Sequence, residues 1–363
     1  FEGSKNVPPG DYDRLSLLAG GDNNAFTTDD KTNYYLLLPG NQLELGLWLE
    51  SDRMLQFAIP EISLVTQKEV VKEEKRQNYD NRPYGTVSIE FAPRLFIKSN
   101  YRWDGIGDMK HIDNASMDEI KYFYEKYYVP NNAVLTIVGD IDIEETKKLV
   151  KKYFNEIPPN KNIIRPEFAE VPLEKEIRDT IYDNVQFPGI FIGYRVPREN
   201  SREFFIFDIL SDILATGESS RFYQELVYKK QLVSDINCYI DAKEFAGVFY
   251  IYGILMPDKT ITDVEKEIDR IIEDIKKGDI KESEIQKVKN KIESRNVYRL
   301  QTILSKAELL AHYKTFYNDA ELINTILSNY EKITKDDIVA SSQNFLNKSN
   351  RVVLYYLPKK KIN

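Results

Sequence analysis

The chain has 363 residues, of which 42% are hydrophobic and 30% charged, and its formal net charge is −8. This length suggests two domains, and the composition is that of an ordinary soluble globular protein. The negative charge argues against a general nucleic-acid binder, which needs a basic surface. A single cysteine, Cys238, excludes an intrachain disulfide and a cysteine-based zinc site. No apolar run approaches the roughly 20 residues of a membrane span.

The first part of the chain alternates short strand patterns with amphipathic helix patterns. In chain order we expect a helix at 11–19, strands at 24–28 and 32–38, helices at 43–55, through Glu74 and at 84–96, a helix at 116–128, a strand at 133–138 and a helix at 143–154. Ser116 followed by Glu119 is a capping box, which marks the start of its helix. Pro130 lies just beyond the end of that helix.

The second part follows a proline-rich stretch. Pro158, Pro159, Pro166 and Pro172 indicate a linker at 158–175. Beyond it we expect strands at 177–182 and 189–196, helices at 204–214 and 219–228, strands at 234–240 and 248–254, several further helices and a last strand at 352–357. The predicted domains are therefore an N-terminal domain at 1–157 and a C-terminal domain at 176–363.

The two domains repeat one another. Residues 116–120 match 334–338, and residues 132–135 match 350–353, both at an offset of 218 (334 − 116 and 350 − 132). In each match a capped helix leads into an apolar strand at the end of a domain. The shared offset makes a chance likeness the weaker explanation. The sequence therefore predicts a duplicated α+β domain.

The helix through Glu74 contains the most informative spacing. Gln67, Val70, Val71 and Glu74 stand at i, i+3, i+4 and i+7, which is one face of a helix. A carboxylate at the end of an inward face is rare unless it is paired or bound to a metal. The alternative is a charged surface helix with Glu74 at the edge of its stripe. The spacing alone leaves both interpretations open.

The histidine content limits the metal chemistry. His111 and His312 are the two histidines, and they are far apart in the sequence. A hydrolytic zinc site normally uses two or three, so these residues do not supply a complete site. We expect His111 in the loop before the helix at 116–128 and His312 on a late helix, both in structural or exposed positions.

Four segments together resemble a known family, the pitrilysin/insulinase-type zinc metallopeptidases, which include mitochondrial processing peptidase. The segments are Phe1-Glu2-Gly3-Ser4, Asn24-Ala25-Phe26-Thr27, Val70-Val71-Lys72-Glu73-Glu74, and Tyr127-Tyr128-Val129-Pro130-Asn131-Asn132 leading to Val138-Gly139-Asp140. The likeness is greatest to bacterial members with two-domain subunits and covers essentially the whole chain. It implies an α+β fold of two repeated α/β-sandwich domains, the first truncated at its N-terminus.

The resemblance also implies a zinc site that these residues only partly contain. In the family an H-x-x-E-H helix supplies two zinc histidines and the general-base glutamate, and a later helix supplies a third ligand, a glutamate. The family pattern places H-x-x-E-H immediately upstream of Phe1, so we expect no catalytic residue in this chain and Zn²⁺ only in the intact protein. Glu74 matches the third ligand. Gln67 stands where active members usually have a glutamate.

The resemblance assigns substrate binding to the strand that contains Asn24, Ala25, Phe26 and Thr27. These residues match the family's edge strand beside the active site. A peptide can add to such an edge through main-chain hydrogen bonds, which favours extended or unfolded substrates. The simpler interpretation, an ordinary sheet strand, holds in either case.

The second domain departs from the pattern of active members. They resemble L-R-x-x-x-Q-L-G-Y, whereas residues 226–234 carry Val227 in place of the arginine and Ser234 in place of the tyrosine. The resemblance therefore implies a zinc subunit that acts with a homologous second subunit or as a homodimer. The alternatives are a non-catalytic scaffold and a peptide-binding module. By analogy we expect a periplasmic protein, with membrane association through its partners.

Overall fold

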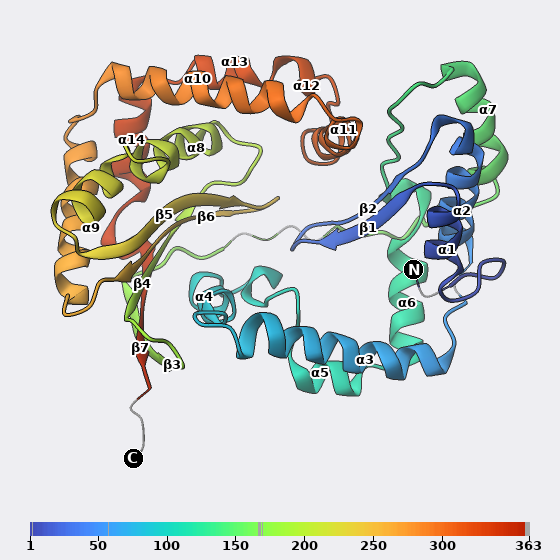
Figure 1. Cartoon of the computed structure of the whole chain (residues 1–363), viewed down its shortest axis with the longest axis horizontal. Coiled ribbons are helices and arrows are strands. Elements are labelled where there is room, and N and C mark those ends of the chain that lie inside the picture. Colours follow the sequence, from blue (N-terminus) through green and yellow to red (C-terminus); the bar gives the residue numbers. More distant parts are fainter. Residues whose placement is uncertain (2, 57, 166–167, 169, 360–363) are drawn as a thin grey trace. The chain divides into compact units, whose positions relative to one another are not determined.

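The computed structural model describes residues 1, 3–56, 58–165, 168 and 170–359 (Figure 1). The chain forms two compact units, each of which combines segments from both halves of the sequence. Unit 1 comprises Phe1–Lys75, Gly105–Pro166 and Arg299–Ala320, and unit 2 comprises Arg76–Asp104, Glu167–Tyr298 and Glu321–Asn363. Glu2 of the first resemblance segment and residues 166, 167 and 169 of the expected linker lie outside the described residues.

Unit 1 is a β-hairpin with helices packed on it. Its elements are α1 (Asp11–Leu18), β1 (Asp22–Thr27), β2 (Thr32–Leu37), α2 (Leu43–Leu55), α3 (Glu61–Lys75), α5 (Met109–Asn114), α6 (Met117–Tyr127), α7 (Ile143–Phe154) and α11 (Ile303–Tyr317). Val7, Tyr12 of α1 and Leu49 of α2 are buried together, and Leu36 of β2 and Trp48 pack against them. Apolar residues of α1, α2 and β2 therefore form one small core.

Unit 2 contains a five-stranded sheet in the order β3-β7-β4-β6-β5. The strands are β3 (Ile177–Asp183), β4 (Gly189–Val196), β5 (Val233–Ala242), β6 (Gly247–Leu255) and β7 (Arg351–Pro358), and the helices are α4 (Val87–Leu95), α8 (Arg202–Ala215), α9 (Ile261–Lys276), α10 (Glu282–Arg299), α12 (Leu322–Thr325), α13 (Leu327–Glu331) and α14 (Lys335–Phe345). β3 runs parallel to β7, and the other neighbours are antiparallel. No helix in the described part of the chain has the length and apolar character needed to cross a membrane.

Both faces of the unit 2 sheet are covered by helices. Phe249 of β6 packs on Phe207 of α8, with the ring centroids 5.2 Å apart. The next residue, Tyr250, packs on Phe91 of α4, at 5.4 Å. Successive strand residues point to opposite faces, so α8 and α4 lie on opposite sides of the sheet. This explains why β4 is apolar along its length and is buried at every residue except Arg195.

The structure confirms the duplicated α+β fold, and the offset of 218 extends over most elements. α2 begins at 43 and α9 at 261, α6 begins at 117 and α14 at 335, and the short 3-10 turns Pro130–Asn132 and Lys348–Asn350 also match. The expected capping boxes at Ser116 and Thr334 are both formed. Identical local signals therefore start equivalent helices in the two halves.

The strand predicted at 133–138 is wrong, because those residues are not in a strand. Their counterpart in the second half is β7, which is held by pairing with β3 and β4. In the described part of the chain no strand pairs with the apolar segment 133–138, so it does not form one.

Two predicted helices and the predicted position of His111 are corrected. The helix expected at 84–96 begins only at Val87, because Tyr84 has a left-handed backbone conformation with φ of 58°. The helix expected at 219–228 is in part a π-helix, Tyr223–Lys229. His111, expected in a loop, lies on α5, whereas His312 lies on α11, a late helix as predicted.

Candidate functional site

β1 contains the residues predicted to bind substrate. Among the described residues its only strand partner is β2, in a two-stranded sheet, so its other edge is unpaired with any strand. Ala25 is half-buried, and Asn24, Phe26 and Thr27 are exposed. The hairpin therefore presents these residues along an open edge, although peptide binding there remains a prediction.

The hairpin register shows which main-chain groups face the open edge. The N–H of Thr28 donates to the carbonyl of Lys31 at 2.8 Å, and Phe26 and Asn33 are partners in the register. In an antiparallel pair, hydrogen-bonded and non-hydrogen-bonded positions alternate. The main-chain groups of Ala25 and Thr27 therefore face away from β2. Consistent with this, the Ala25 N–H donates to Oδ1 of Asn24, at 2.8 Å.

α3 contains Glu74 near its C-terminal end and is attached to α5 by two lysines. Lys68 Nζ donates to the carbonyl of Asp113 at 2.9 Å, and Lys72 Nζ lies 2.8 Å from Asp113 Oδ1. Hydrogen bonds to Asp113 and Glu69 raise the pKa of Lys72. Glu74 itself is exposed. The expectation that Glu74 points inward is therefore wrong, whereas Gln67 and Val71 on the same face are half-buried. A ligand role for Glu74 remains a prediction.

The described residues do not fit a zinc ion by themselves. They contain no group of three or more histidine, cysteine, aspartate or glutamate side chains able to hold a metal. His111 is exposed on α5. His312 is half-buried on α11, where its Nδ1 lies 3.3 Å from Lys31 Nζ. Glu74 alone therefore does not form a metal site.

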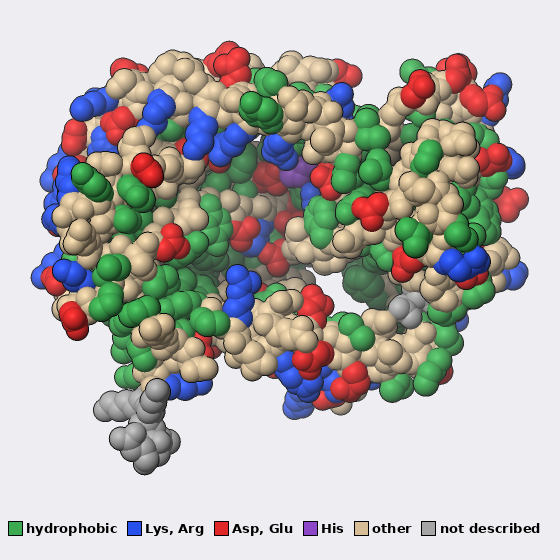
Figure 2. All heavy atoms as spheres, in the orientation of Figure 1, with side chains coloured by type: hydrophobic (Ala, Val, Ile, Leu, Met, Phe, Trp, Pro, Cys, Tyr) green, Lys and Arg blue, Asp and Glu red, His purple; other side chains and the backbone are tan. Residues whose placement is uncertain are grey.

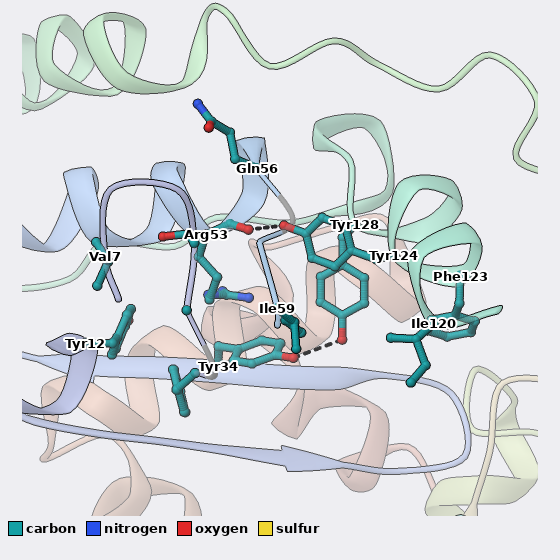
Figure 3. Close-up of a pocket in the computed structure, with 13 residues that line it drawn as sticks. Val7, Tyr12, Tyr34, Arg53, Gln56, Ile59, Ile120, Phe123, Tyr124 and Tyr128 are labelled. Carbon is teal, nitrogen blue, oxygen red and sulfur yellow. Dashed lines mark hydrogen bonds between the residues drawn. The ribbon is translucent and has the colours of Figure 1, made fainter. Parts of the chain in front are cut away.

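Unit 1 also contains a pocket of about 210 Å³ that sequence analysis did not identify (Figure 3). Arg53 lies under the ring of Tyr34, with its guanidinium carbon 3.8 Å from the ring centroid. The hydroxyls of Tyr34 and Tyr128 are 2.9 Å apart, and the hydroxyl of Tyr124 donates to the carbonyl of Arg53. Burial raises the pKa of Tyr124 to about 12 and also raises that of Tyr34, so both hydroxyls are neutral hydrogen-bonding groups.

The pocket is lined by a helix face whose counterpart in the second half is buried. Ile120, Phe123 and Tyr124 of α6 line it, and at an offset of 218 they correspond to buried Ile338, Ser341 and Ser342 of α14. That face of α14 belongs to a helix that packs on α8, whereas the equivalent face of α6 lines the pocket. The sequence signal was the aromatic content of 122–128, but its partners Tyr34 and Arg53 are too distant in the chain to be recognised.

In the second half, the position where the family pattern has an arginine is occupied by Val227. Val227 lies in the π-helix Tyr223–Lys229, and Ser234 Oγ donates to the carbonyl of Ile254 at 3.3 Å. The nearest arginine in sequence, Arg221, donates from Nε and a terminal nitrogen to the two carboxylate oxygens of Glu284, each at 2.8 Å. This bidentate pair occupies the guanidinium.

Comparison with known proteins finds a matching family model and similar proteins. The family model described as "Peptidase M16 inactive domain" matches residues 114–292. The chain is 27% identical over 361 residues to zinc protease PqqE of Helicobacter pylori, covering 99% of this chain and 81% of that protein. These matches agree with the family resemblance found from the sequence.

Solved structures agree as well. A protease from Helicobacter pylori superposes with a TM-score of 0.93 at 27% identity, covering 99% of this chain and 86% of that one. The first half of the periplasmic protease PqqL from Escherichia coli superposes with a TM-score of 0.76 at 18% identity, covering 98% of this chain and 80% of that one, which shows a shared fold.

Proposed function

The chain belongs to the pitrilysin/insulinase-type peptidase family, and we propose that it is the substrate-binding and metal-ligand-bearing subunit of a zinc endopeptidase. The observation that carries the proposal is the open edge of β1. An extended peptide adds there as a further strand, through the outward main-chain groups of Ala25 and Thr27, and its carbonyl replaces Oδ1 of Asn24 as the acceptor of the Ala25 N–H. Binding of this kind recognises the backbone and holds a substrate segment straight, so the substrates are extended or unfolded peptides.

The surface supports recognition through the main chain. On the face shown in Figure 2, acidic and basic side chains are interspersed among uncharged ones. Such a surface does not select substrates by a single sign of charge. Side-chain selectivity then comes from what lies beside β1, where Phe26 is 41% exposed.

We assign the third metal ligand of this subunit to Glu74. The carboxylate is exposed at the end of α3, and no described side chain forms an ion pair with it. Residues 1–363 contain no H-x-x-E-H motif. The zinc site is therefore complete only in a form of the protein that also carries that helix, and the given residues have no hydrolytic centre of their own.

A second subunit completes the proposed enzyme. Val227 and Ser234 offer no arginine or tyrosine, and Arg221 is held by Glu284. A homologous subunit with an Arg-Tyr pair would supply donors to the substrate carbonyl. Periplasmic location is proposed from PqqL of Escherichia coli, which is described as a periplasmic protease.

A second candidate is a non-catalytic peptide-binding or scaffold subunit of the same fold. It is favoured by the family model, which describes an inactive domain, and by the absence of a metal-binding group among the described residues. A peptide-binding subunit keeps the β1 edge in use, whereas a pure scaffold does not.

The proposal is tested by placing proline at the open edge. Ala25→Pro removes an N–H that does not pair with β2, and an edge strand tolerates proline where its N–H faces solvent. We expect roughly five- to tenfold weaker binding of a fluorescent unstructured peptide, measured by anisotropy, because one main-chain hydrogen bond is lost.

The matched control is Ala25→Val, which keeps the N–H and the strand preference and should bind like the unaltered chain. Thermal unfolding of both variants checks that the fold is retained. Equal peptide affinity in the proline variant would exclude β1 as the substrate edge and place peptide binding elsewhere on the chain. No binding by the unaltered chain would leave the scaffold role.

A further inference from the structure

α3 does not pass directly into an ordinary loop. After Lys75 the chain continues as a π-helical turn, Arg76–Asp80, in which the Asn81 N–H donates to the carbonyl of Arg76 at 2.8 Å. Such turns, with hydrogen bonds from residue i to residue i−5, are rare in proteins, and those that occur are often found at functional sites. This turn begins two residues after Glu74. Its conformation therefore determines how the last turn of α3 joins the segment that follows.

Tyr84, just after the turn, is held in a strained backbone conformation. Its φ is 58°, a left-handed value that a bulky residue rarely adopts. Its hydroxyl donates to the carbonyl of Phe187 at 2.6 Å, and its ring centroid lies 5.7 Å from that of Phe191 and 6.1 Å from that of Tyr356. Strain of this kind persists only where the surroundings fix it. The sheet of unit 2 is thus the anchor for Tyr84.

Gly85 connects that anchor to the π-turn. A Cβ at position 85 would lie 2.3 Å from the carbonyl oxygen of Tyr79, 2.9 Å from that of Arg82 and 3.0 Å from that of Asn78. All three obstacles are backbone atoms, so a side chain at 85 would displace the turn itself. The turn and Gly85 are consequently packed in direct backbone contact.

We propose that Tyr84 and Gly85 form a clamp that maintains the π-turn and thereby positions the last turn of α3. A π-turn contains one residue more than an α-turn, and one residue rotates a helix by about 100°. Loss of the π-turn would therefore change the rotation at which the last turn of α3, with Glu74, joins the turn. The clamp stands on the geometry alone, and its consequence for Glu74 as a ligand rests on the proposed function. Tyr84 is a positioning residue and touches no substrate.

The test is amide hydrogen exchange of the full chain, with two variants and two matched controls. Gly85→Ala places a methyl against the turn, whereas Gly105→Ala adds one where no atom lies within 4 Å. Tyr84→Phe removes the hydroxyl that bonds to Phe187, whereas Tyr182→Phe removes one from a tyrosine that is 58% exposed. Peptides covering 67–83 report the clamp, and those covering α6 and β7 report the rest of each unit.

We expect exchange within 70–81 to be roughly tenfold faster in Gly85→Ala and a few-fold faster in Tyr84→Phe, with α6 and β7 unchanged, because local opening exposes the hydrogen bonds of the turn. Unchanged exchange at 70–81, or acceleration spread evenly over β7, would overturn the clamp. Tyr84→Phe keeps the test valid where Gly85→Ala does not fold.

A second measurement separates the clamp from the peptide-binding proposal. Peptide affinity in Tyr84→Phe should equal that of the unaltered chain, because the proposed peptide edge is formed by β1. In a zinc-loaded form that carries the H-x-x-E-H helix, kcat should fall while KM is retained. Absence of peptide binding in the unaltered chain would refute β1 as the edge and leave the exchange result standing.

Discussion

Glu74 and Arg221 are charged side chains in contrasting states. The carboxylate of Glu74 is exposed, and no described side chain forms an ion pair with it. Arg221 is held by both oxygens of Glu284. Burial raises and the Arg221 guanidinium lowers the pKa of Glu284, and the net shift is downward. The carboxylate of Glu74 is therefore available to bind a metal ion, whereas the guanidinium of Arg221 is not available to bind a substrate.

Removal of the charge at Glu74 tests its assignment. In a form of the protein that carries the H-x-x-E-H helix, Glu74→Gln should weaken zinc binding by more than the roughly 10–100-fold typical of residues behind the ligands. Glu73→Gln, the same change one position earlier on the helix, is the control and should retain zinc. Zinc content after dialysis against a graded chelator measures both. Full zinc retention in Glu74→Gln would show that another residue is the ligand.

α4 is the element on which the core of unit 2 depends. Phe91 and Leu95 are fully buried against the sheet. Beyond the end of α4, the Glu170 carboxylate accepts the N–H groups of residues 97–99, and these bonds lower its pKa although burial opposes the shift. Arg195 donates to the carbonyl of Leu95, and burial lowers its pKa. The segment is thus attached by both packing and polar contacts.

Truncation of Phe91 measures this dependence. Phe91→Ala should lower the free energy of unfolding by about 3–5 kcal/mol, the usual cost of a cavity in a packed core. Ser88→Ala, at an exposed position on the same helix, should change it by less than about 0.5 kcal/mol. Denaturant unfolding measures the change in the free energy of unfolding. Hydrogen exchange should show that β4, β6 and β7 lose protection. If those strands kept their full protection from hydrogen exchange in Phe91→Ala, α4 would not be part of their core.

Elements with local signals were predictable from the sequence. The capping boxes at Ser116 and Thr334 fixed the starts of α6 and α14, and the apolar runs of β4 and β7 indicated buried strands. The duplicated fold followed from the spacing between them. Signals of this kind need no information about distant partners.

Features that depend on distant partners were not predictable. The segment 133–138 has a strand sequence but no strand to pair with among the described residues. Glu74 has the spacing of an inward residue, yet no described element covers it. The pocket beside Tyr34 and the left-handed Tyr84 depend on contacts from far along the chain. Periodicity identifies a face of a helix but cannot tell what packs on it.

The two compact units exchange equivalent segments. Unit 2 contains 76–104 from the first half, and unit 1 contains 299–320 from the second. At the offset of 218, α4 begins at a position equivalent to 305, which lies within α11 (Ile303–Tyr317). Each half thus contributes the same helix to the other half's unit. Neither half contains the whole core of its unit, so we expect the two halves to fold as one chain.

At the scale of the whole molecule, we expect activity to depend on a second subunit. Residues 1–363 contain neither H-x-x-E-H nor an Arg-Tyr pair at 227 and 234, so alone they should hydrolyse no peptide and hold no stoichiometric zinc. A zinc-loaded form that carries an H-x-x-E-H helix should still lack an Arg-Tyr pair at 227 and 234 as donors to the carbonyl oxygen, where negative charge develops during cleavage. Loss of one such donor commonly costs about 10²–10³ in rate.

We therefore expect the zinc-loaded subunit alone to be nearly inactive and to gain activity on mixing with a homologous subunit that carries the Arg-Tyr pair. Cleavage of an unfolded peptide, followed with each subunit alone and with both together, measures this gain. A partner whose arginine is replaced by alanine is the control and should restore little activity, because it can associate but lacks a donor. Full activity from the zinc-loaded subunit alone would refute the two-subunit proposal, and Tyr228, 69% exposed beside Val227, would then be the first residue to replace.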